Sequence, residues 1–580
     1  GIGRRQRQMC IRDSFICLLT LAFSYSQTEL IQILNNNSSF IIEGKVISSS
    51  SNFRPNGDIV TNYIVEKTQN LKGSAQANIT VQVVGGQVDG HFQIVTHQVK
   101  LKTGDKGLFF LKRNSSSTNY FFKGEDYFMN YARLSKQEID ELNKSILNLY
   151  PDFEVISHSK NTTRAATNLA EITSVLPQEI SAGTNSDLTI RGTGFGNNKG
   201  SVGFLNANDG GANYFFTHHL IKSWTNTEIL VTVPELAGTG RIKVKIPTTP
   251  ETSVMAPFGT EITIPYSRFT LTTTSYGDSL TIPLRHIGAM PNGANPPTSA
   301  HLIDGAYHFK MFSNFYNNES ARTIFLKYLE EWSCKTGINF LDAGVRTLED
   351  EFSGPLNEVR FQNFDEQGYG GAAFTSIKGV YTCQSSSSSP DPESITAILT
   401  EIDFVYDNQV NWGYDTVAPN EFDFSFATAH EIGHAVLFYH VIDNNSLMHY
   451  AGSNGYRNLQ EIPEPFVSSG ITGVSESISP YPCGDPMTVS SCFTLSLENR
   501  DIKNAISIRP IGSNIEIKTN SIAMIRQIYV YDISGRIVNK AQFKTLPSRH
   551  NINLDSNNTQ IYMVKVHLSN DLVHIAKVII

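Results

Sequence analysis

The chain has 580 residues, too many for one hydrophobic core at about 150 residues per domain, so we expect several domains. Charged residues make up 17% of it, against about 25% in an average soluble protein, which is typical of secreted, β-rich surface proteins. The formal net charge of −8 is spread without a basic stripe and argues against nucleic-acid binding through phosphates.

Residues 1–27 differ from the rest of the chain. Arginines at positions 4, 5, 7 and 12 precede the apolar run FICLLTLAF at 15–23. This order predicts a signal peptide. The run is far shorter than the about 20 residues that cross a bilayer, and no later segment comes close. We therefore expect a soluble mature protein without a transmembrane segment.

Four cysteines follow the leader, and all of them lie beyond residue 300. An even number of cysteines in an exported protein favours disulfides. Proximity in the sequence predicts that Cys334 pairs with Cys383 and that Cys483 pairs with Cys492. Free buried thiols are the alternative.

Residues 28–156 alternate apolar and polar positions in pieces such as FIIEGKVI and ITVQVVGG. A period of two predicts half-buried strands, and KQEIDELNKSIL adds one helical pattern. We expect a small β-rich N-terminal domain, a candidate prodomain, followed by a polar linker at 157–170.

Residues 171–273 contain short apolar segments separated by Gly, Asn and Pro, which predict an antiparallel sandwich. The phrases SVLPQEISAGT, LTIRGTGFG and SWTNTEILVTVP resemble the IPT/TIG family of immunoglobulin-like modules. The resemblance implies an immunoglobulin-like domain that serves as a spacer or an adhesive unit.

Residues 275–475 introduce helical patterns at ESARTIFLKYLEEWSCKTG and FSFATAHEIGHAVLF, with strands between them. A linker at 476–492 leads to short strands at 493–580, where VYDISGRIV and QIYMVKVHLSN resemble the C-terminal sorting domain of type IX secretion cargo of Bacteroidetes. That resemblance implies a partner, the type IX secretion machinery, and a secreted or cell-surface location reached through the periplasm.

The residues HEIGH at 430–434 place two histidines four positions apart. On a helix His430 and His434 share one face, about 40° apart, so both imidazoles can bind one metal ion. Glu431 flanks that face, and apolar residues on the opposite side can pack inward. A core helix that contains this pattern by chance is the alternative.

His440 follows His434 by six positions. In an unbroken helix it would point about 240° away from His434. A sharp turn near Leu437 would instead return its imidazole to the other two and leave a fourth tetrahedral position for water. We predict that the helix ends near Leu437 and that the three imidazole nitrogens lie about 3 to 3.5 Å apart.

The segment SLMHY then places Met448 in a short apolar turn, and HEIGHAVLFYH with such a Met-turn resembles the metzincin metalloproteases. The short interval from His440 to Met448 is similar to that of matrixins. KYLEEWSCKTGINF, FDEQGYGGAAFTSI and EIDFVYDNQVNW resemble the opening helix, the Gly-rich loop with its substrate-binding edge strand, and the next strand of matrixin-like domains. The resemblance covers 306–473 and implies an extended polypeptide substrate, bound along the strand at AAFTS.

The resemblance implies a catalytic Zn²⁺ held by His430, His434 and His440. Glu431 would be the general base that takes a proton from the attacking water. Met448 would form an apolar floor beneath the ligands.

Tyr450 matches a tyrosine that ends an astacin-like Met-turn, so it is a candidate oxyanion stabiliser or fifth ligand. His449 is expected to be structural. The chain departs from the metzincin pattern at Leu437, where the family has a glycine. A side chain with a Cβ is costly in the backbone conformation that ends such a helix.

No cysteine lies between Gln27 and Cys334, so the propeptide cysteine that silences many matrixins is absent. An inhibitory N-terminal domain would have to act by occlusion or through a carboxylate. Matrixin-like domains commonly hold structural Ca²⁺, and Asp365 and Glu366 lie where such a loop is expected; a solvated acidic loop is the alternative.

Together these patterns predict a multidomain protein with an α+β metzincin-like catalytic domain flanked by all-β, immunoglobulin-like sandwich modules. The expected function is that of a secreted zinc-dependent metalloendopeptidase acting on extracellular proteins. The alternative is a cell-surface adhesin or binding protein with a vestigial zincin domain.

Overall fold

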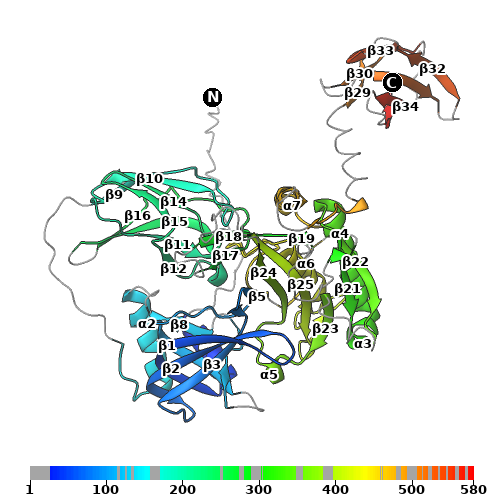
Figure 1. The fold of residues 1–580 in the computed structure, drawn as a ribbon. Coiled ribbons are helices and arrows are strands. Elements are labelled where there is room, and N and C mark those ends of the chain that lie inside the picture. Colours follow the sequence, from blue (N-terminus) through cyan, green and yellow to red (C-terminus); the bar gives the residue numbers. More distant parts are fainter. Residues whose placement is uncertain are drawn as a thin grey trace, which may run out of the picture.

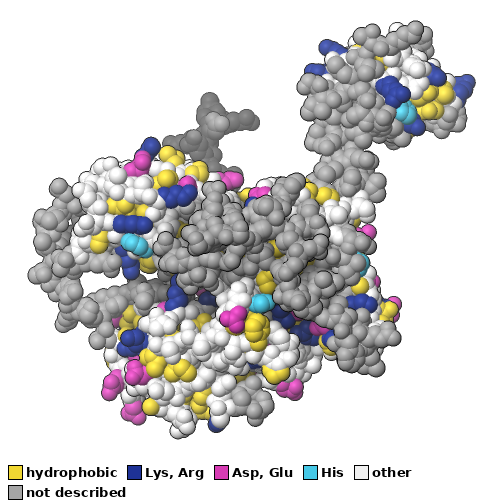
Figure 2. Space-filling model, in the orientation of Figure 1, with side chains coloured by type: hydrophobic (Ala, Val, Ile, Leu, Met, Phe, Trp, Pro, Cys, Tyr) yellow, Lys and Arg dark blue, Asp and Glu magenta, His cyan; other side chains and the backbone are white. Residues whose placement is uncertain are grey.

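The computed structural model describes residues 27–579, except 114–117, 125–126, 132–135, 157–169, 249–251, 274–279, 289–301, 304, 348–356, 383–395, 453, 458, 460, 479–484, 493–505, 512–513, 520–524, 533–535, 544–546, 555–560 and 569–572. Nearly all of the expected signal peptide and linker, together with Cys383 and Cys483, lie outside the described residues. On the face drawn in Figure 2, basic and acidic side chains of the described residues are scattered, in keeping with the even spread of charge along the sequence.

The N-terminal domain is a small β-barrel, a sheet that closes on itself (Figure 1). Its order is β1-β2-β3-β7-β6-β8, and β1 also pairs with β6. Because successive side chains point to opposite faces, Ile42 and Phe109 enter an inner core while Ile41 and Phe110 pack against two helices. The elements are α1 (Gln27–Asn37), β1 (Phe40–Phe53), β2 (Ile59–Lys72), β3 (Asn78–Val84), β6 (Lys106–Arg113), β7 (Tyr120–Phe121), β8 (Phe128–Asn130) and α2 (Lys136–Leu149).

The IPT/TIG region forms a sandwich of two antiparallel four-stranded sheets, β13-β14-β10-β9 and β12-β11-β15-β16. Alternating burial along each strand supplies one shared core between the sheets. The elements are β9 (Glu171–Leu176), β10 (Asp187–Thr193), β11 (Ser201–Asn206), the 3-10 helix η3 (Ala207–Asp209), β12 (Tyr214–Thr217), β13 (Ile221–Trp224), β14 (Glu228–Thr232), β15 (Ala237–Ile246) and β16 (Thr252–Met255).

The central domain is built on a mixed sheet in the order β20-β21-β23-β25-β24-β5-β4. Strands β21, β23 and β25 are parallel, and β24 is antiparallel to β25. Its strands are β17 (Thr270–Thr273), β18 (Leu280–Arg285), β19 (Ile287–Gly288), β20 (Leu302–Ile303), β21 (Ala306–Met311), β22 (Phe340–Val345), β23 (Asn357–Gln362), β24 (Ala373–Thr382), β25 (Thr396–Asp407), β26 (Trp412–Gly413), β27 (Phe422–Asp423) and β28 (Asp485–Pro486).

Strands β4 (Gly86–Val88) and β5 (His91–Val95) belong to the N-terminal part of the chain, yet they complete the sheet of the central domain. They form a hairpin after β3, and β5 pairs antiparallel with β24 (Figure 1). The strand at AAFTS, expected to offer a free edge, is therefore covered on that edge by β5.

Two long helices of the central domain carry its core. Helix α4 begins at an Asn318 side chain that accepts a hydrogen bond from the backbone of Ala321, and it ends at Gly337 in the left-handed conformation, φ 88°. Trp332 of α4 donates from Nε1 to the carbonyl of Ala429 in α6, at 3.0 Å. The helices are α3 (Ser313–Tyr316), α4 (Glu319–Thr336), α5 (Phe364–Gln367), α6 (Phe424–Ala435) and α7 (Glu464–Ile478).

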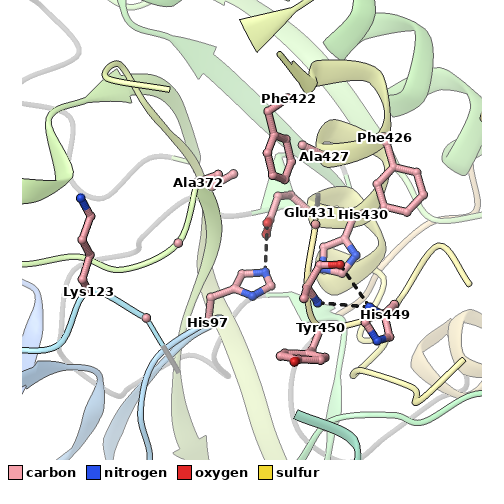
Figure 3. Close-up of a pocket in the computed structure, with 15 residues that line it drawn as sticks. His97, Lys123, Ala372, Phe422, Phe426, Ala427, His430, Glu431, His449 and Tyr450 are labelled. Atoms are coloured by element: carbon pink, nitrogen blue, oxygen red, sulfur yellow. Dashed lines mark hydrogen bonds and ion pairs between the residues drawn. The ribbon is translucent and has the colours of Figure 1, made fainter. Parts of the chain in front are cut away.

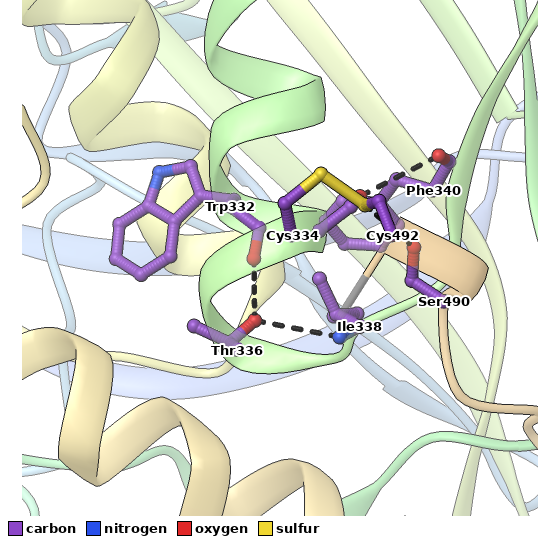
Figure 4. The surroundings of a disulfide bond; sticks show 8 residues. Trp332, Cys334, Thr336, Ile338, Phe340, Ser490 and Cys492 are labelled. Carbon is purple, nitrogen blue, oxygen red and sulfur yellow. Dashed lines mark hydrogen bonds between the residues drawn. A yellow bond between two sulfur atoms is a disulfide. The ribbon is translucent and has the colours of Figure 1, made fainter. Parts of the chain in front are cut away.

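The predicted disulfide pairings are wrong. Cys334, near the end of α4, is bonded to Cys492, 158 residues further along (Figure 4). The prediction used sequence proximity, whereas the pairing follows from how the chain returns to the central domain.

Residues 485–492, part of the linker expected at 476–492, return along the central domain. Strand β28 pairs with β19, the backbone of Thr488 donates to Gly305 at 2.9 Å, and that of Ser490 donates to Gly337 at 3.0 Å. This places Cys492 beside the end of α4.

Residues 506–579 contain two sheets, β29-β30-β33 and β32-β31-β34-β35, with a core of their own. Among the described residues no helix is long and apolar enough to cross a membrane. The strands are β29 (Ile506–Ile511), β30 (Asn514–Thr519), β31 (Ile525–Tyr531), β32 (Ile537–Gln542), β33 (Arg549–Asn553), β34 (Ile561–Leu568) and β35 (Val573–Ile579).

Candidate metal centre

Helix α6 places the first two histidines. It begins at Asp423, whose side chain accepts a hydrogen bond from the backbone of Phe426. His430 and His434 lie on its shared face, and their Nε2 atoms are 3.0 Å apart. That separation lies at the short end of the predicted range and suits two nitrogens bound to one ion.

The helix ends at Ala435, and the chain turns at Leu437, whose φ is +74°. The backbone of Leu437 donates to His434 at 2.9 Å and that of Phe438 donates to Gly433 at 3.1 Å, the two hydrogen bonds of a Schellman motif. The prediction that the helix stops here is confirmed. The chain adopts the glycine-like turn even though the residue has a Cβ.

The turn directs His440 back to the first two histidines. Its ring centre lies 4.8 Å from that of His434 and 5.4 Å from that of His430. The backbone of Tyr439 donates to Ser267 at 2.8 Å, which fixes the returning chain against the segment that follows the IPT/TIG sandwich.

Each of the three histidines uses Nδ1 for a hydrogen bond to an oxygen. The acceptors are the carbonyl of Leu447 for His430 at 2.6 Å, the carbonyl of Phe438 for His434 at 2.8 Å and the Oδ1 of Asn208 for His440 at 2.8 Å, and the last comes from the IPT/TIG module. A proton fixed on Nδ1 leaves the Nε2 lone pair free for a metal. No pattern in the sequence pointed to Asn208.

Burial keeps these rings neutral. It lowers the pKa of His430 to about 4 and lowers the pKa of His434 and of His440 well below the ordinary value. Within the described part of the chain, His440 Nε2 is a buried atom without a hydrogen-bond partner. An orphaned neutral imidazole nitrogen at this convergence is suited to a divalent metal such as zinc, so the residues fit the ion.

Met448 lies where a floor was expected. It is fully buried, and a Cβ on Gly433 would come within 2.6 Å of its sulfur, so this glycine makes room for the methionine under the helix between the two ligands. The backbone of Val441 donates to the Met448 carbonyl at 2.9 Å, which closes the turn after His440.

Glu431 lies beside the histidines. Its carboxylate accepts a hydrogen bond from the hydroxyl of Thr375 in β24 at 2.8 Å and a longer one from Thr96 at 3.4 Å. Burial by itself would raise the pKa of this carboxyl, but the adjacent imidazoles, above all His97, lower the pKa of Glu431 to about 2. The group is therefore ionised, the state in which a carboxylate has lone pairs open to a proton.

His97 is a fourth histidine at the centre, and it was not predicted from the sequence. Its Nε2 lies 3.2 Å from a Glu431 oxygen (Figure 3). One ligand atom from it and one from each of His430, His434 and His440 all lie within 4.8 Å of one another. It follows β5 and has φ +59°. The sequence held only an indirect hint: the N-terminal domain has no cysteine, so any residue of it that reaches the metal has to be of another type.

A cavity of about 210 Å³ opens at the centre. His97, Lys123 and the loop before β24 line one side, and His449 and Tyr450 line the other (Figure 3). His449 Nδ1 contacts the carbonyl of Ala451 at 3.1 Å, a local contact in keeping with a structural part. Tyr450 lines the same cavity as His430 and Glu431.

The expected calcium loop has another use in this structure. Asp365 binds Lys112 at 2.8 Å and Lys123 at 3.6 Å, both from the N-terminal domain. The Glu366 carboxylate accepts a hydrogen bond from Asn363. Calcium binding here stays a prediction.

Comparisons with known proteins identify two parts of the chain. Residues 170–265 match the IPT/TIG domain family, and residues 509–580 match the secretion system C-terminal sorting domain. Both expectations are confirmed. The sorting domain identifies the chain as a secreted or cell-surface protein and suggests the type IX secretion machinery as a partner.

No curated protein matches the chain. Among solved structures, the "Putative phosphatase" from Bacteroides thetaiotaomicron is 11% identical, with a TM-score of 0.16, and 70% of this chain and 85% of that one are covered. The tetra-tandem repeat of the extending region of a large adhesion protein is 7% identical, with a TM-score of 0.13, at 94% and 91% coverage. Likenesses this weak bear on neither fold nor function. The family findings establish a mostly β, multidomain secreted protein with an immunoglobulin-like module.

Proposed function

We propose that this protein is a secreted zinc-dependent endopeptidase whose central domain is matrixin-like. One observation carries the proposal: three buried histidines donate through Nδ1 and converge through their other nitrogens beside an ionised glutamate. Helix α6 carries His430 and His434 and ends at Ala435, as the return of His440 to the other two requires.

His430, His434 and His440 would hold the ion. When bound, zinc would lower the pKa of a water toward about 7 and polarise the scissile carbonyl. The Nδ1 hydrogen bonds fix the ring orientations, so the ligands need little rearrangement on binding.

Glu431 is the proposed general base. Its carboxylate would accept a proton as the water oxygen attacks the peptide carbon, and it would return that proton to the amide nitrogen as the C–N bond breaks. The Thr375 hydroxyl holds one carboxylate oxygen and so orients the group. Tyr450, on the cavity wall, is the candidate to stabilise the oxyanion.

Extended polypeptides are the proposed substrates. The outer edge of β24 can hydrogen-bond an added strand, as its pairing with β5 illustrates. Thr375 of that strand touches Glu431, so a chain bound along it passes the catalytic carboxylate.

The test combines metal content with hydrolysis. Zinc is measured in the purified chain and in His430→Ala and His434→Ala, and the parent is expected to hold one ion per chain and each variant less. Each chain is first treated briefly with trypsin, which is then inhibited, because the N-terminal domain is a candidate prodomain that has to be cut away. Casein cleavage is then followed, with 1,10-phenanthroline and Glu431→Gln as controls. Equal cleavage by the parent and by Glu431→Gln under the same treatment would refute the proposal.

The alternative is a cell-surface binding protein with an inactive centre, which the IPT/TIG module favours as a common adhesive unit. It predicts that zinc is bound and that no casein is cleaved under any of these treatments.

A further inference from the structure

We propose that the N-terminal domain inhibits the central domain of the same chain, with His97 as the fourth metal ligand and residues 91–96 in the place of a substrate strand. The proposal rests on the proposed function, because it concerns the regulation of the same centre.

The histidine geometry is the first step. His97 offers a ligand atom within 4.8 Å of those of the other three, and its ring centre lies 4.9 Å from that of His440 and 5.4 Å from that of His430. Three imidazoles leave one tetrahedral position, and His97 is placed to fill it. An imidazole there excludes water and has no carbonyl to hydrolyse.

His97 also engages the proposed base. Its Nε2 lies 3.2 Å from Glu431 Oε1, so one ring contacts the carboxylate as well as the ligand cluster. Its φ of +59° is uncommon for a residue with a Cβ and is a strained backbone conformation. Contacts around His97 have to hold it in this conformation, and the pairing of β5 with β24 just before it supplies such contacts.

Strand β5 follows the edge where a peptide would lie. Val95 pairs with Ser376, Ile94 with Ile377 and Gln93 with Lys378 in an antiparallel register. The ladder continues past β5, where the backbone of Thr96 donates to the Thr375 carbonyl at 3.1 Å and the Thr96 hydroxyl accepts from the Thr375 backbone at 2.9 Å. A substrate strand cannot bind this edge while β5 occupies it.

Apolar contacts anchor the strand. Phe92 is 1% exposed and belongs to the core of the central domain, and a Cβ on Gly379 would lie 2.2 Å from its ring, so this glycine accommodates Phe92. Val95 joins a separate cluster with Phe374 and Tyr369 of the central domain. Burying a Phe side chain removes a large apolar surface from water and so favours a docked strand over a loose one.

Ion pairs between the domains surround the same interface. Lys378 of β24 binds Asp58 of the N-terminal domain at 3.1 Å, and both groups are largely buried. Asp365 binds Lys112 and Lys123, and Lys123 lines the cavity. These contacts place complementary charges on both sides and match one surface to the other.

The ligand number tests His97 directly. The intact chain and its variants are loaded with Co²⁺, and imidazole ligands are counted by X-ray absorption and from the visible spectrum. Four are expected in the parent and three plus solvent in His97→Asn, because asparagine tolerates positive φ but lacks the ring. His91→Ala, which removes an imidazole from β5, just before His97, should keep four. Three imidazoles in the parent, or four in His97→Asn, would overturn the proposal.

Access to the centre is the second readout. Binding of a fluorescent peptide hydroxamate should tighten at least 10-fold in His97→Asn and in Phe92→Ala, which weakens the docking of β5, and should not change in His91→Ala. Equal affinity in all four chains would contradict occlusion. Circular dichroism verifies folding, and His97→Gln replaces His97→Asn if that variant unfolds.

The two proposals fail in different ways. If the parent binds no metal, both fall together. If it binds metal through His430, His434 and His440 with the same ligand number whether or not residue 97 is histidine, the inhibitory role alone falls.

Discussion

The two sides of the metal centre originate differently. One side, α6 with the turn at Leu437, comes from 17 consecutive residues, 424–440, and carries three of the four histidines. The other side comes from β5 and from the IPT/TIG module, which supply His97 and Asn208. Local geometry positions the residues of the first side, and packing between domains positions those of the second. Substitutions on the first side should therefore affect hydrolysis most, and those on the second should affect metal affinity and access to the metal.

The largest expected effect is on the α6 side. Glu431→Gln should retain the metal and lose casein hydrolysis by about 10²-fold or more, because the ligands persist while the proton acceptor is gone. Metal content and initial rates are measured on trypsin-treated chains. A variant that loses metal in step with activity would show that Glu431 acts in holding the site.

The disulfide is the next largest expected effect. Cys334→Ser should lower the free energy of unfolding by about 2 to 4 kcal/mol, because the bond closes a long loop and fixes residues 485–492 on the central domain. Denaturant unfolding of the oxidised parent and the variant measures it. Cys383→Ser is the matched control, and an equal loss there would point to a different pairing.

Asn208→Ala is expected to weaken metal binding about 10- to 100-fold, since it removes the acceptor that orients His440. Competition with a metallochromic chelator measures the affinity. Asn213→Ala, a change in the same loop, should have little effect. If both variants bind as the parent does, the IPT/TIG module contributes nothing to the centre.

The smallest expected effect is the difference in stability between two variants at Leu437. The Leu437 side chain is 1% exposed, so truncation to Ala should cost about 2 to 5 kcal/mol through the cavity it leaves. Leu437→Gly removes slightly more side chain but relieves the strain of φ +74°. It should therefore be more stable than Leu437→Ala by about 1 kcal/mol, the reverse of the usual order. Thermal and denaturant unfolding compare the pair.

The residues of the α6 side were predictable from the sequence. The spacing of His430 and His434 is a property of any α-helix, and the need to return His440 predicted the end of the helix. The IPT/TIG and sorting domains were identified from their phrases alone, and Met448 lies beneath the helix where it was expected.

The contributions that were missed come from contacts between distant segments. Thr96 and Glu431 are 335 residues apart, and Asn208 and His440 are 232 apart. Nothing in the pattern around His97 specifies which surface β5 will cover. The cysteine pairing failed for the same reason, because it depends on where residues 485–492 dock.

The bond between Cys334 and Cys492 has a mechanical consequence. Cys492 is the last described residue before the stretch that leads to the sorting domain, and Cys334 lies in α4, which packs on α6. A pulling force applied through the tail therefore passes along a covalent link into the central domain. The disulfide transmits the force directly from Cys492 to Cys334 and bypasses the residues between them. The short pairing of β28 with β19 is therefore not pulled apart when the tail is under tension.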